Sequence, residues 1–401
     1  MPPILRSTRA GRYVAHPRGF HSFQPAALPP EPDLDLSRLT RLLSEADSAL
    51  GRLEGAAWIL PNPDLFVAMY VRQEAVLSSQ IEGTQASLTD LLLFEAGQDD
   101  DGHTPDVEEV FNYVRAMNHG LQRLRADEFP LSLRLIREIH AELMQGVRGQ
   151  EKDPGEFRRS PVWIGPRNCS LQNATFVPPA EGPELMSALG ELEHYLYDQR
   201  YPNLIHAGLV HAQFETIHPF LDGNGRMGRL LITFLLCQRQ VLSKPLLYLS
   251  YFLKQHRAEY YDRLQAIRTD GHWEEWLAFF LRGIREVADQ ATSTARRILA
   301  MREEHRRLLE REGKASGNMV RALDTMFHQP YLTPKALAEA LDLNYQTANT
   351  LLARLSELGL VTEQTGYKRN RKYAYQPYLA LFEEPGGDSG PGSTPPREVN
   401  T

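Results

Sequence analysis

Cysteine is scarce in this chain of 401 residues, and its scarcity excludes two classes of site. The two cysteines, Cys169 and Cys237, lie far apart in the sequence and form no Cys-x-x-Cys pair. A disulfide framework and a thiolate metal site are therefore excluded as organising features. This cysteine usage favours a reducing cytoplasm as the location.

Long hydrophobic runs and an excess of positive charge are also missing. The longest apolar stretch, Leu230–Cys237, is far too short to cross a bilayer, and the chain begins without the apolar core of a signal peptide. The net charge is −7, which argues against general adhesion to nucleic acid or to an anionic membrane. We therefore expect a globular protein with no membrane association.

Helical periodicity is what the sequence does contain. Apolar side chains recur at helical spacing along most of the chain, so the pattern predicts a mainly α protein. The predicted helices cover residues 36–53, 63–81, 88–95, 106–125, 131–147, 182–199, 203–217, 226–239, 257–268, 273–289 and 291–312. Residues 1–35 are rich in Pro, Arg and Gly and predict an extended arm.

Two segments depart from this helical pattern. Residues 159–177 surround the short β-prone run Val162-Trp163-Ile164 with Pro and Gly, which predicts a hairpin or flap between helices. After a linker at 313–318, the order changes to helix, turn, helix and β-hairpin, with Thr333-Pro334 as a helix start. That order is typical of a winged helix-turn-helix.

The segment His218–Arg229, which reads HPFLDGNGRMGR, concentrates the chemistry. A glycine-rich turn, Gly223-Asn224-Gly225, leads into a helix, whose N-terminus is a ready site for an anion. Arg226 and Arg229 lie one turn apart, so both can reach one polyphosphate. Asp222 is an oxygen ligand of the kind that Mg²⁺ uses beside phosphates, and His218 can accept a proton near neutral pH. The combination indicates phosphoryl or nucleotidyl transfer onto a hydroxyl.

A dinucleotide-binding interpretation competes with this one. Gly223, Gly225 and Gly228 match the spacing G-x-G-x-x-G. That fingerprint requires a strand before the loop, whereas the preceding residues predict a helix, so the match does not indicate a Rossmann fold.

The segment resembles the Fic family motif HxFx(D/E)GNGRxxR at every defined position, including Phe220. The resemblance covers about residues 66–278 and implies a Fic-type helical core that transfers AMP from ATP to a Tyr, Thr or Ser hydroxyl of a protein. It implies that His218 is the general base and that Asp222 holds Mg²⁺. Gly223, Asn224 and Gly225 would form the anion hole, and Arg226 and Arg229 would bind the β and γ phosphates of ATP.

A second segment resembles the inhibitory motif (S/T)xxxE(G/N) of Fic proteins that carry their own inhibitor. Ser78 and Glu82 are four residues apart on one helix face, followed by Gly83. The resemblance implies that Glu82 pairs with Arg229. A carboxylate in that position would deny the guanidinium to the γ phosphate.

Two further sets of residues carry weaker signals. In the family, the hairpin corresponding to Val162, Trp163 and Ile164 is similar to a clamp that pairs with an extended target segment, although these residues also suit an ordinary core. Tyr260 and Tyr261 resemble the adenine-pocket tyrosines of the family, and a packed aromatic pair is the alternative.

We expect five parts. They are an N-terminal arm and inhibitory helical region (1–104), a Fic core (105–290), a helical linker (291–318), a winged helix (319–382) and a disordered tail (383–401). The winged helix could bind DNA through Tyr345, Gln346 and the basic residues near Lys368, or it could bind protein. Three functional alternatives stay open: a DNA-binding regulator with a Fic sensor core, an enzyme using another nucleotide, and an enzyme that removes AMP. A homodimer is compatible with the sequence.

Overall fold

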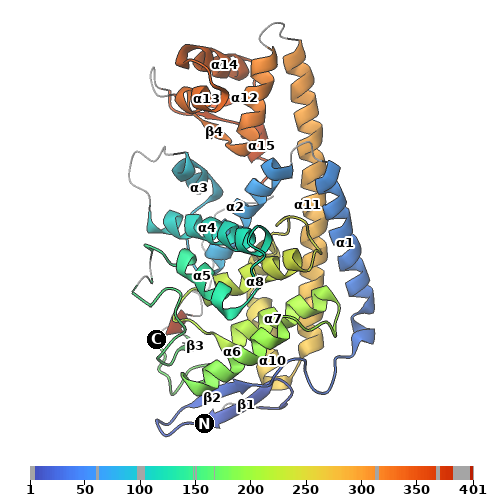
Figure 1. Ribbon diagram of the computed structural model, residues 1–401, viewed down its shortest axis with the longest axis vertical. Coiled ribbons are helices and arrows are strands. Elements are labelled where there is room, and N and C mark those ends of the chain that lie inside the picture. Colours follow the sequence, from blue (N-terminus) through green and yellow to red (C-terminus); the bar gives the residue numbers. More distant parts are fainter. Residues whose placement is uncertain are drawn as a thin grey trace.

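The computed structural model in Figure 1 is an elongated, mainly helical molecule with three small sheets. It describes residues 5–59, 63–96, 104–147, 149, 151–166, 168–311, 316–366, 371–382 and 398–400. Among these residues, no helix combines the length and the apolar character needed to cross a membrane. The predicted mainly α class is confirmed.

The body of the molecule is a layered set of helices around α7. After the short 3₁₀ helix η1 (Leu36–Arg38), its helices are α1 (Thr40–Ile59), α2 (Pro63–Ile81), α3 (Leu88–Glu95), α4 (Pro105–Arg125), α5 (Leu133–Leu143), α6 (Pro183–Tyr195), α7 (Asn203–Ile217), α8 (Asn224–Gln238), α9 (Ser250–Gln255), α10 (Arg257–Asp270) and α11 (Trp273–Glu310). Every residue of α7 from Leu204 to Ile217 is buried, so α7 is the centre of the core. Apolar residues occur on every side of α7, and a helix of this kind packs inside the core.

Helix α11 corrects one prediction from the sequence. The periodicity predicted two helices, at 273–289 and 291–312, but the structure has a single helix of 38 residues. No Pro or Gly interrupts the predicted break, and Ala288, Ala291 and Ala295 continue one buried stripe through it. This stripe packs along α1, so the helix has no physical reason to end there.

The N-terminal arm also differs from the expectation of an extended segment. Residues Gly11–Ala15 (β1) and His21–Pro25 (β2) pair as an antiparallel hairpin. Phe23 is fully buried, its ring lies against Tyr13, and its backbone N–H donates to Val177 O at 2.8 Å. These long-range contacts stabilise the hairpin, and they leave no periodic signal in the sequence.

The predicted flap forms a minimal hairpin. Strand β3 (Trp163–Gly165) is bridged to Phe176, with Ile164 N–H and Phe176 N–H each donating to the carbonyl of the other residue. On its other edge, β3 pairs antiparallel with β7 (Glu398–Asn400). A strand at 398–400 was not predicted. Residues 383–397 and Thr401, where disorder was expected, lie outside the described residues.

The C-terminal part has the element order expected for a winged helix. It runs α12 (Ser316–His328), β4 (Tyr331–Leu332), α13 (Pro334–Leu341), α14 (Tyr345–Glu357), β5 (Thr362–Glu363), β6 (Tyr373–Ala374) and α15 (Gln376–Leu379), with a sheet ordered β4-β6-β5. Thr333 and Asn344 cap α13 and α14 through their side-chain oxygens. Helices α12 and α15 were not foreseen, and Lys368 lies outside the described residues.

Candidate active site

The turn between α7 and α8 carries the motif and is held by side chains. His218 ends α7 with a φ of 50°, a left-handed conformation that is uncommon for a residue other than glycine. The Asn224 side chain accepts from Phe220 N–H and donates to Phe220 O, both at 2.8 Å, so it closes the turn. Arg158 donates to His218 O at 2.8 Å and to Pro179 O at 2.6 Å. These bonds place His218 in a defined orientation.

The His218 ring lies in a buried environment without a hydrogen-bond partner for either ring nitrogen among the described residues. Burial, followed by the nearby cations Arg158 and Arg268, lowers the pKa of His218 to about 3. The imidazole is therefore neutral at pH 7. A neutral ring with an available nitrogen can accept a proton.

One pocket gathers residues from four parts of the chain. It is lined by Glu82, Ile164, Thr175, Phe176, Glu215, His218, Arg229, Tyr260, Tyr261, Leu264, Gln265 and Arg268. Six of the residues singled out from the sequence thus meet at one place: Glu82, Ile164, His218, Arg229, Tyr260 and Tyr261. By contrast, Val162 is buried in the core and Trp163 donates from its indole nitrogen to Cys169 O, and neither lines the pocket.

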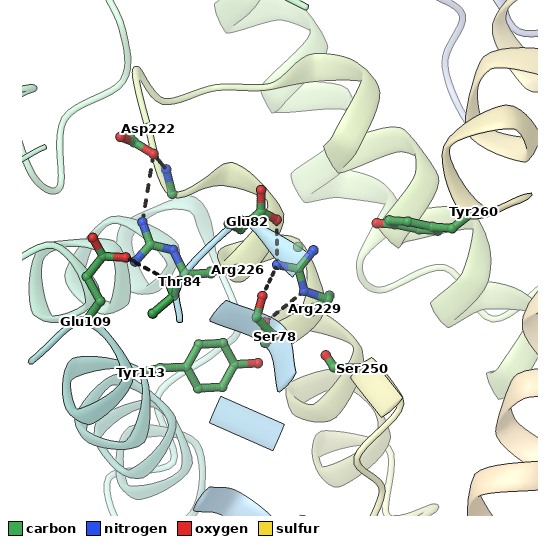
Figure 2. Close-up of polar contacts among 12 residues, drawn as sticks. Ser78, Glu82, Thr84, Glu109, Tyr113, Asp222, Arg226, Arg229, Ser250 and Tyr260 are labelled. Atoms are coloured by element: carbon green, nitrogen blue, oxygen red, sulfur yellow. Dashed lines mark hydrogen bonds and ion pairs between the residues drawn. The ribbon is translucent and has the colours of Figure 1, made fainter. Parts of the chain in front are cut away.

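Glu82 and Arg229 form an ion pair in this pocket (Figure 2). Arg229 Nη2 donates to Glu82 Oε1 at 2.6 Å, and the same guanidinium donates to Ser78 Oγ at 2.8 Å and to Ser78 O at 3.0 Å. Burial would lower the pKa of Arg229, but Glu82, then Tyr260 and Tyr261, raise it above its ordinary value. The guanidinium therefore stays charged although it is buried.

The Glu82 carboxylate also lies against the N-terminal turn of α8. A Cβ atom on Gly225 would overlap Glu82 Oε1, so only a glycine permits this approach. The positive end of the helix dipole favours an anion at this point. Glu82 thus occupies an anion site made by the α8 N-terminus and Arg229.

Arg226, predicted to be a second phosphate ligand, has a different neighbourhood (Figure 2). It does not line the pocket and is 3% exposed. Its Nη1 lies 3.4 Å from Glu109 Oε2 on α4, and its Nη2 lies 3.8 Å from Asp222 Oδ1. Both arginines of the motif are therefore paired with acidic side chains in this structure.

Asp222 is the residue that would hold the magnesium implied by the motif. Asp222 Oδ1 accepts from Gly223 N–H at 2.6 Å, while Oδ2 faces Lys152 Nζ at 3.7 Å and the side chain is 34% exposed. Among the described residues, no group of three or more His, Cys, Asp or Glu converges on a point. A single accessible carboxylate beside an anion site fits Mg²⁺, which takes one or two carboxylates plus phosphate oxygens and water.

His140 on α5 packs against the turn between α7 and α8. It was not identified from the sequence. Its ring stacks on Phe220 with a centroid distance of 3.7 Å. Nδ1 accepts from Gly155 N–H at 2.9 Å and Nε2 donates to Asp222 O at 3.0 Å. Burial lowers the pKa of His140 to about 4, so the ring is neutral and its hydrogen bonds specify one tautomer.

Glu74 lies two helical turns before Glu82 on α2 and was also missed. It is buried beneath Ser78 and accepts from Ser250 N–H at 3.0 Å, from Ser250 Oγ, and from Tyr113 OH at 3.2 Å. Burial raises the pKa of Glu74 to about 7, and the Ser250 hydrogen bonds and Arg229 oppose that rise. The spacing of Glu74, Ser78 and Glu82 by four residues could have indicated one polar stripe.

The two tyrosines differ in their surroundings. Tyr260 OH donates to His211 Nε2 at 2.9 Å, which leaves His211 Nδ1 to donate to Gly228 O. Tyr261 is half-buried and packs beside Tyr260 with a centroid distance of 5.1 Å. Tyr260 is thus part of the packing that supports α8, while both rings line the pocket.

Residues 40–122 match the family described as Fic/DOC family N-terminal, and residues 130–236 match the Fic/DOC family. The protein adenylyltransferase Fic of Aedes aegypti is 30% identical over 260 residues, which cover 61% of this chain and 46% of that protein. The protein of the same name from Culex quinquefasciatus is 30% identical over 243 residues, covering 58% and 41%. The chain spans less than half the length of these curated relatives.

A solved structure supports the architecture. The Fic family protein from Desulfovibrio desulfuricans G20 superposes with a TM-score of 0.57 at 20% identity. The superposition covers 86% of this chain and 97% of that one. This likeness shows a shared fold.

Proposed function

The chain belongs to the Fic/DOC family, and from that premise we propose that it transfers AMP from ATP to a hydroxyl of a target protein. One observation carries the proposal: His218 and Arg229 line a single pocket at the N-terminus of α8. A neutral base and an anion site within one pocket are the parts that nucleotidyl transfer to a hydroxyl needs. The curated relatives named protein adenylyltransferase support the same reaction.

In the proposed reaction, the motif residues act as base, phosphate ligands and metal ligand. A ring nitrogen of His218 takes the proton of the acceptor hydroxyl, and the hydroxyl oxygen bonds to the α phosphorus of ATP. The bond from that phosphorus to the bridging oxygen of the β phosphate breaks, and pyrophosphate leaves. The α8 N-terminus, with Arg226 and Arg229, would hold the β and γ phosphates. Asp222 would hold Mg²⁺, which neutralises charge on the phosphates.

The proposal includes autoinhibition by Glu82. Its carboxylate takes the position at Arg229 and at the α8 N-terminus that the γ phosphate would need. Two anions cannot share that position, because their repulsion in a buried pocket is strong. ATP would then bind only with its phosphates misplaced, so the unmodified chain should be nearly inactive.

We assign target binding to the edge of β3 and adenine binding to Tyr260 and Tyr261. The β3 edge carries β7 as an added antiparallel strand, so its backbone geometry suits an extended peptide. Ile164 lies in β3 and also lines the pocket, which would bring such a peptide close to His218. The two tyrosines form an aromatic wall of the same pocket.

The remaining assignments are further proposals. They are the DNA contacts of the winged helix, a homodimer, a cytoplasmic location and the division into five parts. In that division, α11 runs from the core into the linker without a break, and residues 398–400 form β7. Tyr345, at the start of α14, is 52% exposed, which suits contact with a partner. Gel-shift assays with the full chain would test DNA binding, and light scattering would test the dimer.

The reaction itself can be tested with the Glu82→Gly form. Incubated with Mg²⁺ and ATP radiolabelled at the α phosphate, it should label itself or added protein far more strongly than the unmodified chain. ATP labelled at the γ phosphate should transfer nothing. Adding His218→Ala should abolish the labelling. Label from the γ position, or labelling that survives His218→Ala, would overturn the proposal.

A further inference from the structure

Glu109 is a buried carboxylate that the reaction described above does not use. It lies in α4 with 2% of its surface exposed, and its Oε2 is 3.4 Å from Arg226 Nη1. Arg226 is 3% exposed, so both charges are removed from water. A carboxylate in this position fixes one edge of the planar guanidinium and directs its other edge toward Asp222.

The same oxygen of Glu109 has a second partner on the inhibitory segment. Thr84 Oγ1 donates to Glu109 Oε2 at 3.2 Å, and Thr84 is 3% exposed. Thr84 follows Glu82 by two residues, and its N–H donates to Ser79 O at 3.2 Å in the turn that ends α2. Figure 2 shows Thr84 and Glu109 on one side of this turn and Arg229 on the other.

A second bond joins the turn to α4. The backbone N–H of Gln85 donates to Asp106 Oδ2 at 2.7 Å, one helical turn before Glu109. The residues just after Glu82 are therefore held by two acidic side chains of α4. Their position determines where the Glu82 carboxylate can lie, since only Gly83 separates Glu82 from Thr84.

We propose that Glu109 is a positioning residue that orients Arg226 toward the β phosphate and, through Thr84, holds the inhibitory turn against α4. The proposal rests on the proposed function and assigns two separable effects to one carboxylate. The contact with Arg226 supports phosphate binding. The contact with Thr84 supports inhibition, although Thr84 does not line the pocket.

The first arm of the test measures nucleotide binding, which requires no transfer reaction. In the full-length Glu82→Gly form, calorimetry would compare ATP with AMP in the presence of Mg²⁺, with and without Glu109→Gln. Gln keeps the shape of the side chain and removes its charge. We expect ATP to bind about tenfold more weakly after Glu109→Gln and AMP to bind unchanged, because AMP lacks the β phosphate. Glu109→Asp should recover part of the loss.

An equal loss of affinity for ATP and AMP would show that Glu109 has a merely structural role. Unchanged affinity for both nucleotides would show that Glu109 does not contribute to phosphate binding. Both outcomes overturn the first half of the proposal. Because binding is measured directly, they can be told apart from a failure of the proposed function, which would appear as absent labelling by the Glu82→Gly form that still binds ATP.

The second arm uses Thr84 in the otherwise unmodified chain. Thr84→Val removes the hydroxyl at nearly constant shape, and we expect self-labelling to rise several-fold, about five times, as one hydrogen bond is lost. Thr84→Ser retains the hydroxyl and should stay inhibited. Hydrogen exchange at the amides of residues 82–86 should accelerate in the Val form only. Equal behaviour of the Val and Ser forms would overturn the link between Thr84 and inhibition.

Discussion

The surroundings of Arg226 and Arg229 differ, although the two arginines lie one turn apart on α8. Arg229 is paired at 2.6 Å with Glu82, whose side chain is 31% exposed and lines the pocket. Arg226 is paired at 3.4 Å with Glu109, whose side chain is 2% exposed and lies in the helical core. One carboxylate is accessible to a ligand and the other is not.

This difference separates two uses of the same chemical pair. An accessible carboxylate at the end of a helix can be displaced, so it suits a removable inhibitor. A buried carboxylate near the start of a packed helix, such as Glu109 in α4, cannot leave without a large desolvation cost to its partner, so it suits permanent orientation. Both pairs have the residue types Glu and Arg, and only burial and position distinguish their roles.

The largest effect on activity should come from replacing Arg226 or Arg229 in the Glu82→Gly form, which lacks the inhibitory carboxylate. In the Glu82→Gly form, we expect Arg226→Ala and Arg229→Ala each to lower kcat/KM for AMP transfer about 100-fold to 1000-fold, as for one preorganised donor to a developing anion. Arg41→Ala, at an exposed position on α1, is the control. A loss below threefold for Arg226→Ala would show that only Arg229 serves the phosphates.

The next largest effect is on the free energy of unfolding, which should fall more when Glu109 is removed than when Glu82 is removed. Glu109→Ala leaves the buried Arg226 with only Asp222, 3.8 Å away, as an acidic partner, and we expect it to lower the free energy of unfolding by about 3 kcal/mol. Glu82→Ala leaves Arg229 hydrogen-bonded to Ser78 Oγ and Ser78 O, so we expect a smaller loss of about 1 kcal/mol. Urea denaturation followed by tryptophan fluorescence measures both. Equal losses would contradict the distinction between a removable and a permanent pair.

The pH profile tests whether opening the Arg229 side of the pocket alters the base. Burial, followed by Arg158 and Arg268, lowers the pKa of His218 to about 3, and none of these causes involves Glu82. The neutral, proton-accepting form should therefore persist as the pH falls to 6 in the Glu82→Gly form. An ordinary histidine pKa of 6.5 would instead cut kcat/KM about fourfold at pH 6. Rates at saturating Mg²⁺, with ATP binding measured at each pH, decide between these outcomes.

The smallest effect on activity should come from weakening the pairing of β7 with β3, the strand whose Ile164 lines the pocket. Ile164 uses its N–H and C=O toward Phe176, so those of Trp163 and Gly165 point to β7. Glu398→Pro or Asn400→Pro removes an N–H that faces β3, whereas the N–H of Val399 faces away. We expect the first two changes to raise labelling of added proteins by the Glu82→Gly form about threefold, the order of one lost hydrogen bond.

Val399→Pro is the matched control for these two substitutions and should leave the labelling unchanged. If all three prolines have the same effect, the backbone pairing of β7 with β3 does not limit access of a target. If none has an effect, target segments do not use this edge of β3.

The sequence predicted those site residues that lie close together along the chain better than those that lie far apart. The turn, both arginines and His218 lie within twelve consecutive residues, so local spacing and charge were sufficient to indicate phosphate chemistry. Glu82 was found through resemblance to an inhibitory motif, because its partner Arg229 lies 147 residues away. Glu109, His140 and Arg158 were missed, since nothing in the local sequence distinguishes them from the other polar residues of α4, of α5 or of a loop.

The fold also divides into features set by local sequence and features set by long-range contacts. Periodicity located most helices, but it placed a break in α11 where the buried stripe against α1 continues. Hairpin β1–β2 was missed because its stability comes from Phe23 and from a backbone bond to Val177, both long-range contacts.

The sequence by itself determined the helical class, the anion-binding turn and the residue types that can move a proton and bind phosphate. Those properties follow from local periodicity and from the chemistry of adjacent side chains. Resemblance to a known motif implied the pair of Glu82 and Arg229, but only the tertiary structure decided that Glu82 also lies at the α8 N-terminus and that Glu109 lies at Arg226. Burial and pairing depend on which helices pack together, and no spacing within one helix specifies that.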